Sequence, residues 1–319
     1  MKLRVLSLFS GIGAFEMALR NIEIDYELVN FCENDKYAIK SYCAIHGVDE
    51  NLNLGDITKV SIENLPKDID LITHGSPCQD FSAAGLQRGG DEGSKTRSSL
   101  MWNTVEIIKH CQPKYVIWEN VKNVLSKKHK HNFDKYLKTL ELLGYTNYWK
   151  VLNAKDYGIP QHRERIFVVS IFQNDFNIDN NNEIDKYQYE FPQSINLNKT
   201  IFDLLDNDVD KKYYLSDKAI EKMKRFAPKG EVTDKIAPTL TTELAHHTGK
   251  NFYPKLCKII KTYRRITPRE AFRLMGMLDS DIDKIQSTGI SDTQQYKLAG
   301  NSIVVPVLEE IFKNLFLKM

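Results

Sequence analysis

The N-terminal stretch constrains the fold more than any other part of the chain. A β-rich run at residues 3–9 is followed by a turn that contains Gly11 and Gly13, and then by apolar residues at helical spacing over residues 14–20. A strand, a glycine turn and a helix in this order are typical of the opening of a nucleotide-binding βαβ fold. We therefore expect an α/β protein with a doubly wound sheet, whose ligands lie at the carboxyl edge of the strands.

The glycine turn departs from the dinucleotide-binding fingerprint at one position. That fingerprint has a third glycine where this chain has Glu16. A carboxylate at the start of the helix would meet a bound pyrophosphate in a low-dielectric site, so two negative charges would repel. A nicotinamide dinucleotide is therefore a poor candidate for the cofactor, and a dehydrogenase is the weakest of the functions considered.

Two acidic residues favour a nucleoside site instead. The extended run 26–32 ends in Glu33, about 20 residues after Gly13, where an acid can accept hydrogen bonds from ribose hydroxyls. Asp56 follows a glycine and is placed to accept from an adenine amino group while Ile57 packs on the ring. Each acid alone is more often a solvated surface residue. Together with the glycine turn they predict a nucleoside site without phosphates, as S-adenosylmethionine requires.

A cysteine stands directly after the next apolar run. Residues 70–73 break at a Gly-Ser-Pro sequence, and the following residue is Cys78. A lone cysteine after a strand is usually a small buried hydrophobic residue. Pro77 fixes its own φ and biases Ser76 toward an extended conformation, which directs Cys78 outward at the rim of the sheet. We therefore expect Cys78 to act as a nucleophile.

The segment after the cysteine, residues 80–99, is rich in glycine, serine and charged residues and has no apolar periodicity. Such segments are usually functional loops, and the plain alternative is an ordinary flexible loop. Its cations Arg88, Lys95 and Arg97 are suited to contact phosphates. A helix is expected over residues 100–110.

Further reactive side chains are expected at the same edge of the sheet. The buried run 115–118 leads into Glu119, and Arg163 and Arg165 precede the strong strand 166–171. The spacing predicts that both guanidinium groups lie on one face of a strand. An Arg-Glu-Arg alternation is also typical of an ion-pair ladder on an edge strand. The placement beside the expected nucleophile favours the functional interpretation.

The totals exclude some classes of protein and leave others open. The chain has 319 residues, a net charge of +2 and five cysteines without CxxC spacing. This cysteine pattern predicts neither a disulfide framework nor a zinc site, and it indicates a reducing, cytoplasmic location. No run approaches the ~18 apolar residues that span a membrane, so we expect no membrane partner and read the N-terminus as the first strand. We expect no metal site.

A change of composition near residue 172 toward Asn, Asp and Gln predicts a linker. We expect a catalytic domain at residues 1–175, completed by 290–319, and a smaller domain at 176–289. Within the smaller domain, a basic stretch is expected to face phosphates. Its members are Lys250, Lys255, Lys258, Lys261, Arg264 and Arg265. The sequence from Thr267 to Glu270 predicts a helix-capping box.

Six blocks in order along the chain resemble those of the DNA C5-cytosine methyltransferase family. The blocks are Phe9-Ser10-Gly11-Ile12-Gly13, Gly75-Ser76-Pro77-Cys78-Gln79-Asp80-Phe81-Ser82, Glu119-Asn120-Val121, Gln161-His162-Arg163-Glu164-Arg165, Thr267-Pro268-Arg269-Glu270 and Gly300-Asn301-Ser302. The resemblance implies a Rossmann-like, S-adenosylmethionine-dependent methyltransferase fold with a smaller target-recognition domain. It covers nearly the whole chain except about residues 172–260.

The resemblance also implies roles for individual residues. The catalytic residues would be Cys78, Glu119, Arg163 and Arg165. The cofactor-binding residues would be Phe9, Gly11, Gly13, Glu33, Asp56, Ile57, Pro77, Leu100, Asn301 and Ser302. The DNA-binding residues would be Gln79, Ser82, Arg97 and Thr239. The chain departs from relatives at Asn34, where tryptophan is frequent, and at Ala84, where serine is frequent.

The expected chemistry follows from the weak nucleophilicity of cytosine carbon 5. Addition of the Cys78 thiolate to carbon 6 would make carbon 5 electron-rich, with Glu119 acting at ring nitrogen 3 and the two arginines favouring the thiolate. A stacked base is out of reach of such a site, so the target cytosine must be flipped out of double-stranded DNA.

Two alternatives remain beside this function. One branch of the same family methylates tRNA cytosine and carries a Cys-Phe-Thr tripeptide, which this chain lacks. A catalytically silent DNA-binding module is the other, and the intact residues Cys78, Glu119 and Arg165 speak against it. We expect a monomer that acts on DNA, with a cognate restriction endonuclease as a candidate partner. The sequence does not identify the recognised site.

Overall fold

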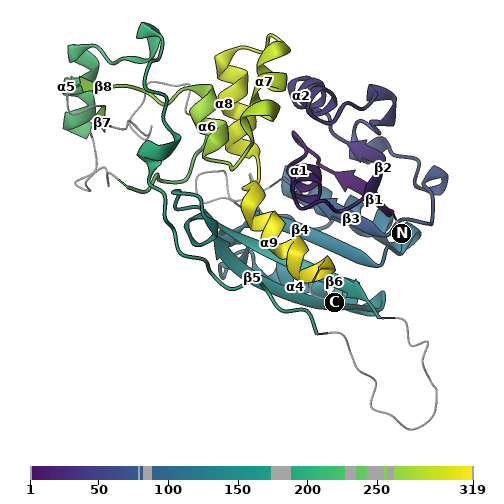
Figure 1. Ribbon diagram of the computed structural model, residues 1–319. Helices are drawn as coiled ribbons and strands as arrows, with labels where there is room; N and C mark the ends of the chain where they lie inside the picture. Colours follow the sequence, from purple (N-terminus) through teal and green to yellow (C-terminus); the bar gives the residue numbers. More distant parts are fainter. Residues whose placement is uncertain are drawn as a thin grey trace.

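A six-stranded sheet forms the centre of the protein, seen in a computed structural model that describes residues 2–77, 80–81, 88–173, 188–226, 235–242, 255–256 and 262–317. The strand order is β2-β1-β3-β4-β6-β5 (Figure 1). The strands are β1 (Leu3–Leu8), β2 (Tyr26–Cys32), β3 (Leu71–His74), β4 (Tyr115–Val121), β5 (Tyr145–Asn153) and β6 (Glu164–Phe172). The first four are parallel, and β6 is antiparallel to both of its neighbours. The predicted α/β, Rossmann-like class is confirmed.

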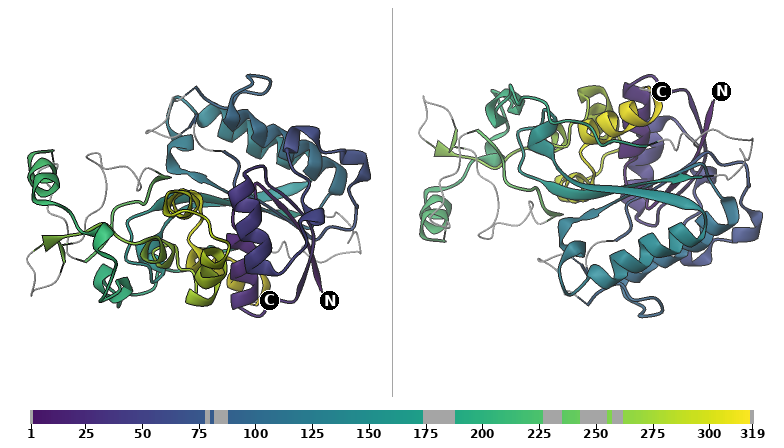
Figure 2. Two further views of the ribbon diagram at one scale, coloured as in Figure 1. Left: turned by 90° about the horizontal axis from the view of Figure 1, so that it is seen from above. Right: turned by 90° about the horizontal axis from the view of Figure 1, so that it is seen from below.

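Helices cover both faces of this sheet (Figure 2). Helices α1 (Ala14–Asn21) and α9 (Val305–Phe316) lie on one face with α2 (Lys36–His46), and α3 (Met101–Cys111) and α4 (Lys130–Leu142) lie on the other. Side chains along β4 alternate between these two cores: Tyr115 and Ile117 belong to the first, and Val116 and Trp118 to the second. A strand buried on both faces reads as a continuous apolar run, which is why the sequence reveals it.

The turn after β1 requires glycine at its last position. Gly13 caps α1 with a φ of 80°, a left-handed conformation that glycine adopts without steric cost. A Cβ built on Gly13 would lie 2.0 Å from Nε2 of His46, so a side chain has no room there. The predicted strand and helix on either side of this turn are therefore confirmed, with bounds within one residue.

The C-terminal segment returns to the N-terminal part of the chain (Figure 1). It contains α6 (Pro268–Arg273), α7 (Asp279–Ser287) and α8 (Asp292–Asn301) before α9. Helix α9 packs on α1, where the rings of Phe15 and Phe312 lie 6.4 Å apart, and α7 packs on α2. The last helix thus completes the layer over the sheet. Among the described residues, no helix is both long and apolar enough to cross a bilayer.

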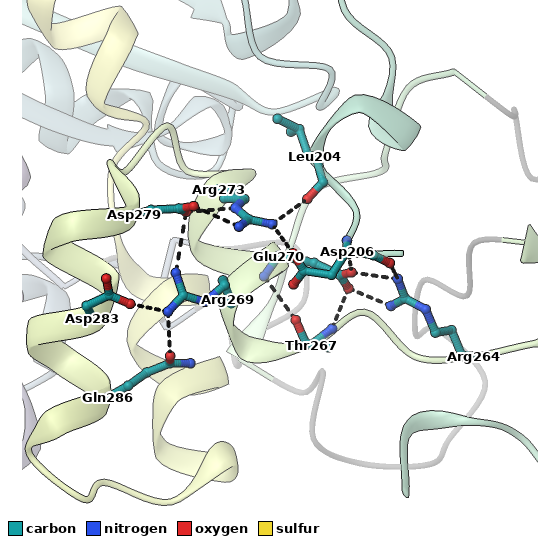
Figure 3. Close-up of polar contacts among 10 residues, drawn as sticks. All are labelled: Leu204, Asp206, Arg264, Thr267, Arg269, Glu270, Arg273, Asp279, Asp283 and Gln286. Atoms are coloured by element: carbon teal, nitrogen blue, oxygen red, sulfur yellow. Dashed lines mark hydrogen bonds and ion pairs between the residues drawn. The ribbon is translucent and has the colours of Figure 1, made fainter. Parts of the chain in front are cut away.

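The smaller lobe contains helix α5 (Asp217–Phe226) and an antiparallel pair, β7 (Lys255–Leu256) and β8 (Thr262–Tyr263). Ion pairs and hydrogen bonds attach it to α6 (Figure 3). Arg264 is fully buried, and its two terminal nitrogens each lie 2.6 Å from an oxygen of Glu270. Glu270 also accepts the backbone N–H groups of Thr267 at 2.7 Å and Asp206 at 2.8 Å.

This network corrects one expectation and confirms another. The predicted capping box is present, because the Thr267 and Glu270 side chains each accept the other's backbone N–H. The expectation that Arg264 faces phosphates is wrong, because its side chain is buried and forms an ion pair with Glu270 in the interior. The side chains of Lys250, Lys255, Lys258 and Lys261 lie outside the described residues.

Candidate active site

Glu119 and Arg165 form an ion pair on adjacent antiparallel strands. Phe167 is opposite Glu119 and Arg165 is opposite Val121 in the ladder between β4 and β6, so Glu119 and Arg165 are diagonal neighbours on one face. Arg165 Nε lies 3.1 Å from Glu119 Oε1, and both side chains are largely buried. The sequence placed Glu119 after the strand, whereas the strand continues through Val121 because β6 pairs along its whole length.

Burial makes the charged form of Glu119 less favourable than it is in water. Burial raises the pKa of the Glu119 carboxyl group, and the positive charges of Arg165 and Arg163 oppose this shift without cancelling it. A buried acid with a raised pKa is protonated in a larger fraction of molecules than an exposed one, and it can donate that proton within a pocket. Glu119 is therefore suited to act as a hydrogen-bond donor or general acid.

Arg163 lies one residue before β6, which begins at Glu164. It lines a small cavity together with Arg165 and Phe167, as its spacing predicts for side chains on one face. Its guanidinium group donates to the carbonyl oxygens of Leu240 at 2.9 Å, Gly300 at 3.0 Å and Ser302 at 2.8 Å. Arg163 thus joins the C-terminal block to the segment that contains Leu240.

The turn after β3 lies against the strand that carries Glu119. Trp118 Nε1 donates to Ser76 Oγ at 3.0 Å, and Asn120 Nδ2 donates to the Ser76 carbonyl oxygen at 3.1 Å. A Cβ built on Gly75 would lie 3.8 Å from Glu119 Oε2. The backbone that leads to the expected nucleophile is therefore held next to the Glu119 carboxyl group. Cys78, Gln79 and Ser82 themselves lie outside the described residues.

The expected cofactor residues from the first two strands come together. The Gly11 N–H donates to Glu33 Oε2 at 2.9 Å, which joins the glycine turn to the acid at the end of β2. Phe9 is half-buried and has a φ of 52°, an uncommon conformation for a residue other than glycine and one that is frequent at functional sites. A Cβ built on Gly11 would meet no atom within 4 Å. The turn is therefore open at Gly11.

Asn53 organises this region and was missed by the sequence analysis. Its Oδ1 accepts the N–H groups of Glu33 and Gly55, both at 3.0 Å, and its Nδ2 donates to the Glu33 carbonyl oxygen at 3.1 Å. One amide side chain thus links the two acidic segments of the expected nucleoside site. An asparagine in a polar loop carries no sequence signal for such a role.

The other expected cofactor residues occupy several environments. Asp56 caps a short 3₁₀ helix by accepting the Thr58 N–H at 3.0 Å, and Ile57 is buried. Pro77 and Leu100 are half-buried. Asn301 is exposed at the end of α8.

Ser302 and the two described DNA-contact candidates differ in burial. Ser302 is buried beside Arg163. Arg97 is exposed, and Thr239 Oγ1 donates to the His162 carbonyl oxygen at 2.6 Å.

Glu16 lies in the interior and not at the ligand side of the turn. Its side chain is fully buried between α1 and the sheet, close to Ser7 and Tyr42. Burial raises the pKa of the Glu16 carboxyl group, with the nearby hydroxyl groups opposing the shift in part. The argument that its charge would repel a pyrophosphate is therefore wrong. Glu16 stands where dinucleotide-binding proteins have their third glycine, and in both cases this position faces the sheet.

A cavity of about 930 Å³ lies away from these residues. It is lined by Lys67 and Ile69 before β3 and by Lys114 before β4, so it opens at the amino ends of the parallel strands. Ligands of doubly wound sheets bind at the opposite, carboxyl ends. This cavity is therefore separate from the site around Glu119.

Comparison with known proteins agrees with this geometry. The profile of the family described as C-5 cytosine-specific DNA methylase matches residues 3–317. Type II methyltransferase M2.ScrFI of Lactococcus lactis subsp. cremoris is 37% identical over 98% of this chain and 99% of its own length. Orphan methyltransferase M.SPRI of Bacillus phage SPR is 32% identical over 98% of this chain and 97% of its own length.

Solved structures show the same fold. The Dnmt2 methyltransferase of S. pombe superposes with a TM-score of 0.76 over 99% of both chains, at 22% identity. The methyltransferase EhMeth of Entamoeba histolytica gives the same TM-score over 100% of this chain and 99% of its own, at 19% identity.

The doubly wound sheet has the fold of these solved methyltransferase structures. The chain belongs to the C-5 cytosine-specific DNA methylase family. It transfers a methyl group to carbon 5 of cytosine in DNA, and its family implies S-adenosylmethionine as the methyl donor.

Proposed function

We propose that this enzyme methylates a flipped-out cytosine within a specific sequence of double-stranded DNA through a covalent adduct between Cys78 and carbon 6. The observation that carries the proposal is the position of the Gly75-Ser76 turn, which leads to Cys78, against the Glu119–Arg165 pair. This arrangement supports the presence of a nucleophile and an acid on either side of one pyrimidine ring.

Each reacting group has one role in the proposed sequence of steps. The Cys78 thiolate forms a bond to carbon 6, and Glu119 donates its proton to ring nitrogen 3 as electron density moves toward carbon 5. Carbon 5 then takes the methyl group as the sulfonium–methyl bond breaks. A base removes the carbon 5 proton, the carbon–sulfur bond to Cys78 breaks to regenerate the thiolate, and ring nitrogen 3 returns its proton to Glu119. Arg165 holds the Glu119 carboxyl group in position, and the charges of Arg163 and Arg165 favour the thiolate.

The methyl donor is S-adenosylmethionine, which supplies an electrophilic methyl group when bound. We propose that Glu33 binds the ribose hydroxyls, that Asp56 accepts from the adenine amino group, and that Phe9 and Ile57 pack on the ring. The open turn at Gly11 and its hydrogen bond to Glu33 support this assignment. Gly13, Pro77, Leu100, Asn301 and Ser302 would complete the site.

DNA recognition is assigned to two parts of the chain. Gln79, Ser82, Arg97 and Thr239 would contact the DNA near the flipped base. Residues 176–289 would form the target-recognition domain, and residues 1–175 with 290–319 the catalytic domain. We propose that the enzyme acts as a monomer and that a restriction endonuclease with the same recognition sequence is its partner.

Bisulfite sequencing tests this function directly. DNA from cells that express the protein should show protected cytosines at one recurrent sequence, and cells that express Cys78→Ser should show none. Protection in the Cys78→Ser cells would contradict the proposed role of Cys78. An absence of protection in both would contradict the activity on DNA.

A further inference from the structure

A single hydroxyl group connects the two backbone groups on either side of the expected nucleophile. Ser98 Oγ donates to the Pro77 carbonyl oxygen at 2.9 Å and accepts the Asp80 N–H at 3.1 Å. Pro77 and Asp80 are separated by Cys78 and Gln79. We call these two hydrogen bonds the hydroxyl bridge.

The hydroxyl bridge joins two peptide groups that are three residues apart in the sequence. In a β-turn, the carbonyl oxygen of the first residue often accepts the N–H of the fourth, which is the relationship between Pro77 and Asp80. Here both groups bond to Ser98 Oγ, which stands between them. The spacing of these two peptide groups is therefore set by a side chain that comes from another part of the chain.

The Asp80 side chain also accepts a hydrogen bond from Ser98. Its Oδ2 accepts the Ser98 N–H at 3.3 Å, and its Oδ1 accepts Arg88 Nε at 2.8 Å. Burial acts to raise the pKa of Asp80, but the Arg88 and Ser98 hydrogen bonds outweigh it and hold the pKa below its usual value. Asp80 is therefore ionised at neutral pH. Two hydrogen bonds join it to Ser98, one from each backbone N–H to the side chain of the other residue.

Ser98 has little freedom to move. Its side chain is fully buried in the 3₁₀ helix η4 (Arg97–Leu100), which Thr96 caps by accepting the Ser99 N–H at 3.3 Å. A Cβ built on Gly90 would lie 3.0 Å from the Ser98 carbonyl oxygen. The neighbouring backbone thus packs tightly against Ser98 and holds the hydroxyl group in place.

We propose that Ser98 is a positioning residue for Cys78, an inference that rests on the proposed role of Cys78 as the nucleophile. Ser76 is held to β4 before the cysteine, and the hydroxyl bridge holds the backbone on both sides of it. Loss of the hydroxyl group leaves the Pro77 carbonyl and the Asp80 N–H free to approach each other or to remain buried and unpaired. Either outcome displaces the residues between them.

The test compares Ser98→Ala with Ser99→Ala. Ser99 is the adjacent buried serine, and its hydroxyl group donates to the Thr96 carbonyl oxygen at 2.7 Å, with neither Pro77 nor Asp80 as a partner. The rate of covalent adduct formation is measured on duplex DNA that contains 5-fluorocytosine, with S-adenosylmethionine present. We expect Ser98→Ala to slow the adduct about 10- to 100-fold, the scale of a misplacement of the reacting atom by about 1 Å. The affinities for S-adenosylmethionine and DNA should not change, and Ser99→Ala should resemble the wild type.

Two further variants separate positioning from folding. Ser98→Thr keeps the hydroxyl group and should recover most of the rate, whereas Ser98→Cys keeps the volume but bonds weakly and should remain slow. If Ser98→Ala does not fold, Ser98→Cys takes its place. An adduct rate equal to that of the wild type, or a loss explained by weaker cofactor binding, overturns the inference. A wild-type enzyme that forms no adduct contradicts the role of Cys78 instead.

Discussion

Arg165 Nε and Glu119 Oε1 lie 3.1 Å apart across two antiparallel strands, although the two residues are more than forty positions apart in the sequence. The pair is buried, so its attraction is not screened by solvent, yet the carboxyl group keeps a raised pKa. Burial therefore dominates over the arginine charges at this acid. A carboxyl group in that state can donate a proton to a ring nitrogen, which an exposed carboxylate cannot do.

Glu119→Gln should lower the methyl-transfer rate about 10²- to 10⁴-fold, because the amide can donate a hydrogen bond but cannot transfer a proton. Initial rates with tritiated methyl donor measure the effect. Glu164→Gln is the matched control, since Glu164 is a neighbouring glutamate paired with Lys122 near the surface. A Glu119→Gln enzyme with the rate of the control would contradict the assignment of Glu119 as the acid.

The rate should depend on pH through Glu119. The group must be protonated to act, so activity should fall as pH rises through its pKa. Arg165 lowers this pKa, and Arg165→Gln should therefore move the falling limb of the pH–rate profile to higher pH while reducing the maximum rate. A falling limb that moves to lower pH in this variant would contradict the effect of the Arg165 charge on the pKa of Glu119.

Glu16→Gln should stabilise the protein in a pH-dependent way. Burial raises the pKa of Glu16, so its contribution to stability is present below its ordinary pKa and is lost as pH rises. The glutamine variant is neutral throughout, and its advantage should grow from near zero at acidic pH to about 1–3 kcal/mol at alkaline pH. Denaturant unfolding at several pH values measures this difference, with exposed Glu63→Gln as the control. An advantage that is independent of pH would contradict the prediction.

Asn53→Ala should weaken S-adenosylmethionine binding about 10- to 100-fold, because the hydrogen bonds that join Glu33 to Gly55 are lost. Titration calorimetry gives the affinity. Asn51→Ala serves as the control, because Asn51 is exposed two residues earlier. Equal affinities for the two variants would show that Asn53 does not organise the nucleoside site.

Arg264→Ala should lower the free energy of unfolding by about 3–5 kcal/mol, since it leaves Glu270 as an unpaired buried charge. Its effect on the salt dependence of DNA binding should be small, because Arg264 does not reach the surface. Exposed Lys211→Ala is the control for stability. A stable Arg264→Ala protein with a reduced salt slope would restore Arg264 as a phosphate contact.

The sequence predicts the local features of this molecule well. The β1 strand, its glycine turn and α1 are close in sequence, and the left-handed φ at position 13 favours the glycine that stands there. The strands that bury both faces appear as apolar runs. Nothing in the sequence reveals the first half of β5, because its side chains mix polar and aromatic residues, are mostly half-buried or exposed, and form no such run.

Contacts between distant segments could not be predicted. Arg163 bonds to carbonyl groups 77, 137 and 139 residues away, and nothing in its own neighbourhood indicates this. Glu119 was expected beyond its strand, because the pairing of β4 with β6 that extends it is non-local. Ser98 reads as one serine among several in a polar segment, although its hydroxyl group spans the Pro77–Asp80 interval.

The most direct test of the mechanism is the mass of the complex formed with duplex DNA that contains 5-fluorocytosine at the recognised position. Fluorine replaces the proton that must leave carbon 5, so the adduct persists after methyl transfer. The account predicts one covalent complex whose DNA is linked to the peptide that contains Cys78, and none with Cys78→Ser. A complex linked to another residue, or methyl transfer by Cys78→Ser at the wild-type rate, would contradict it.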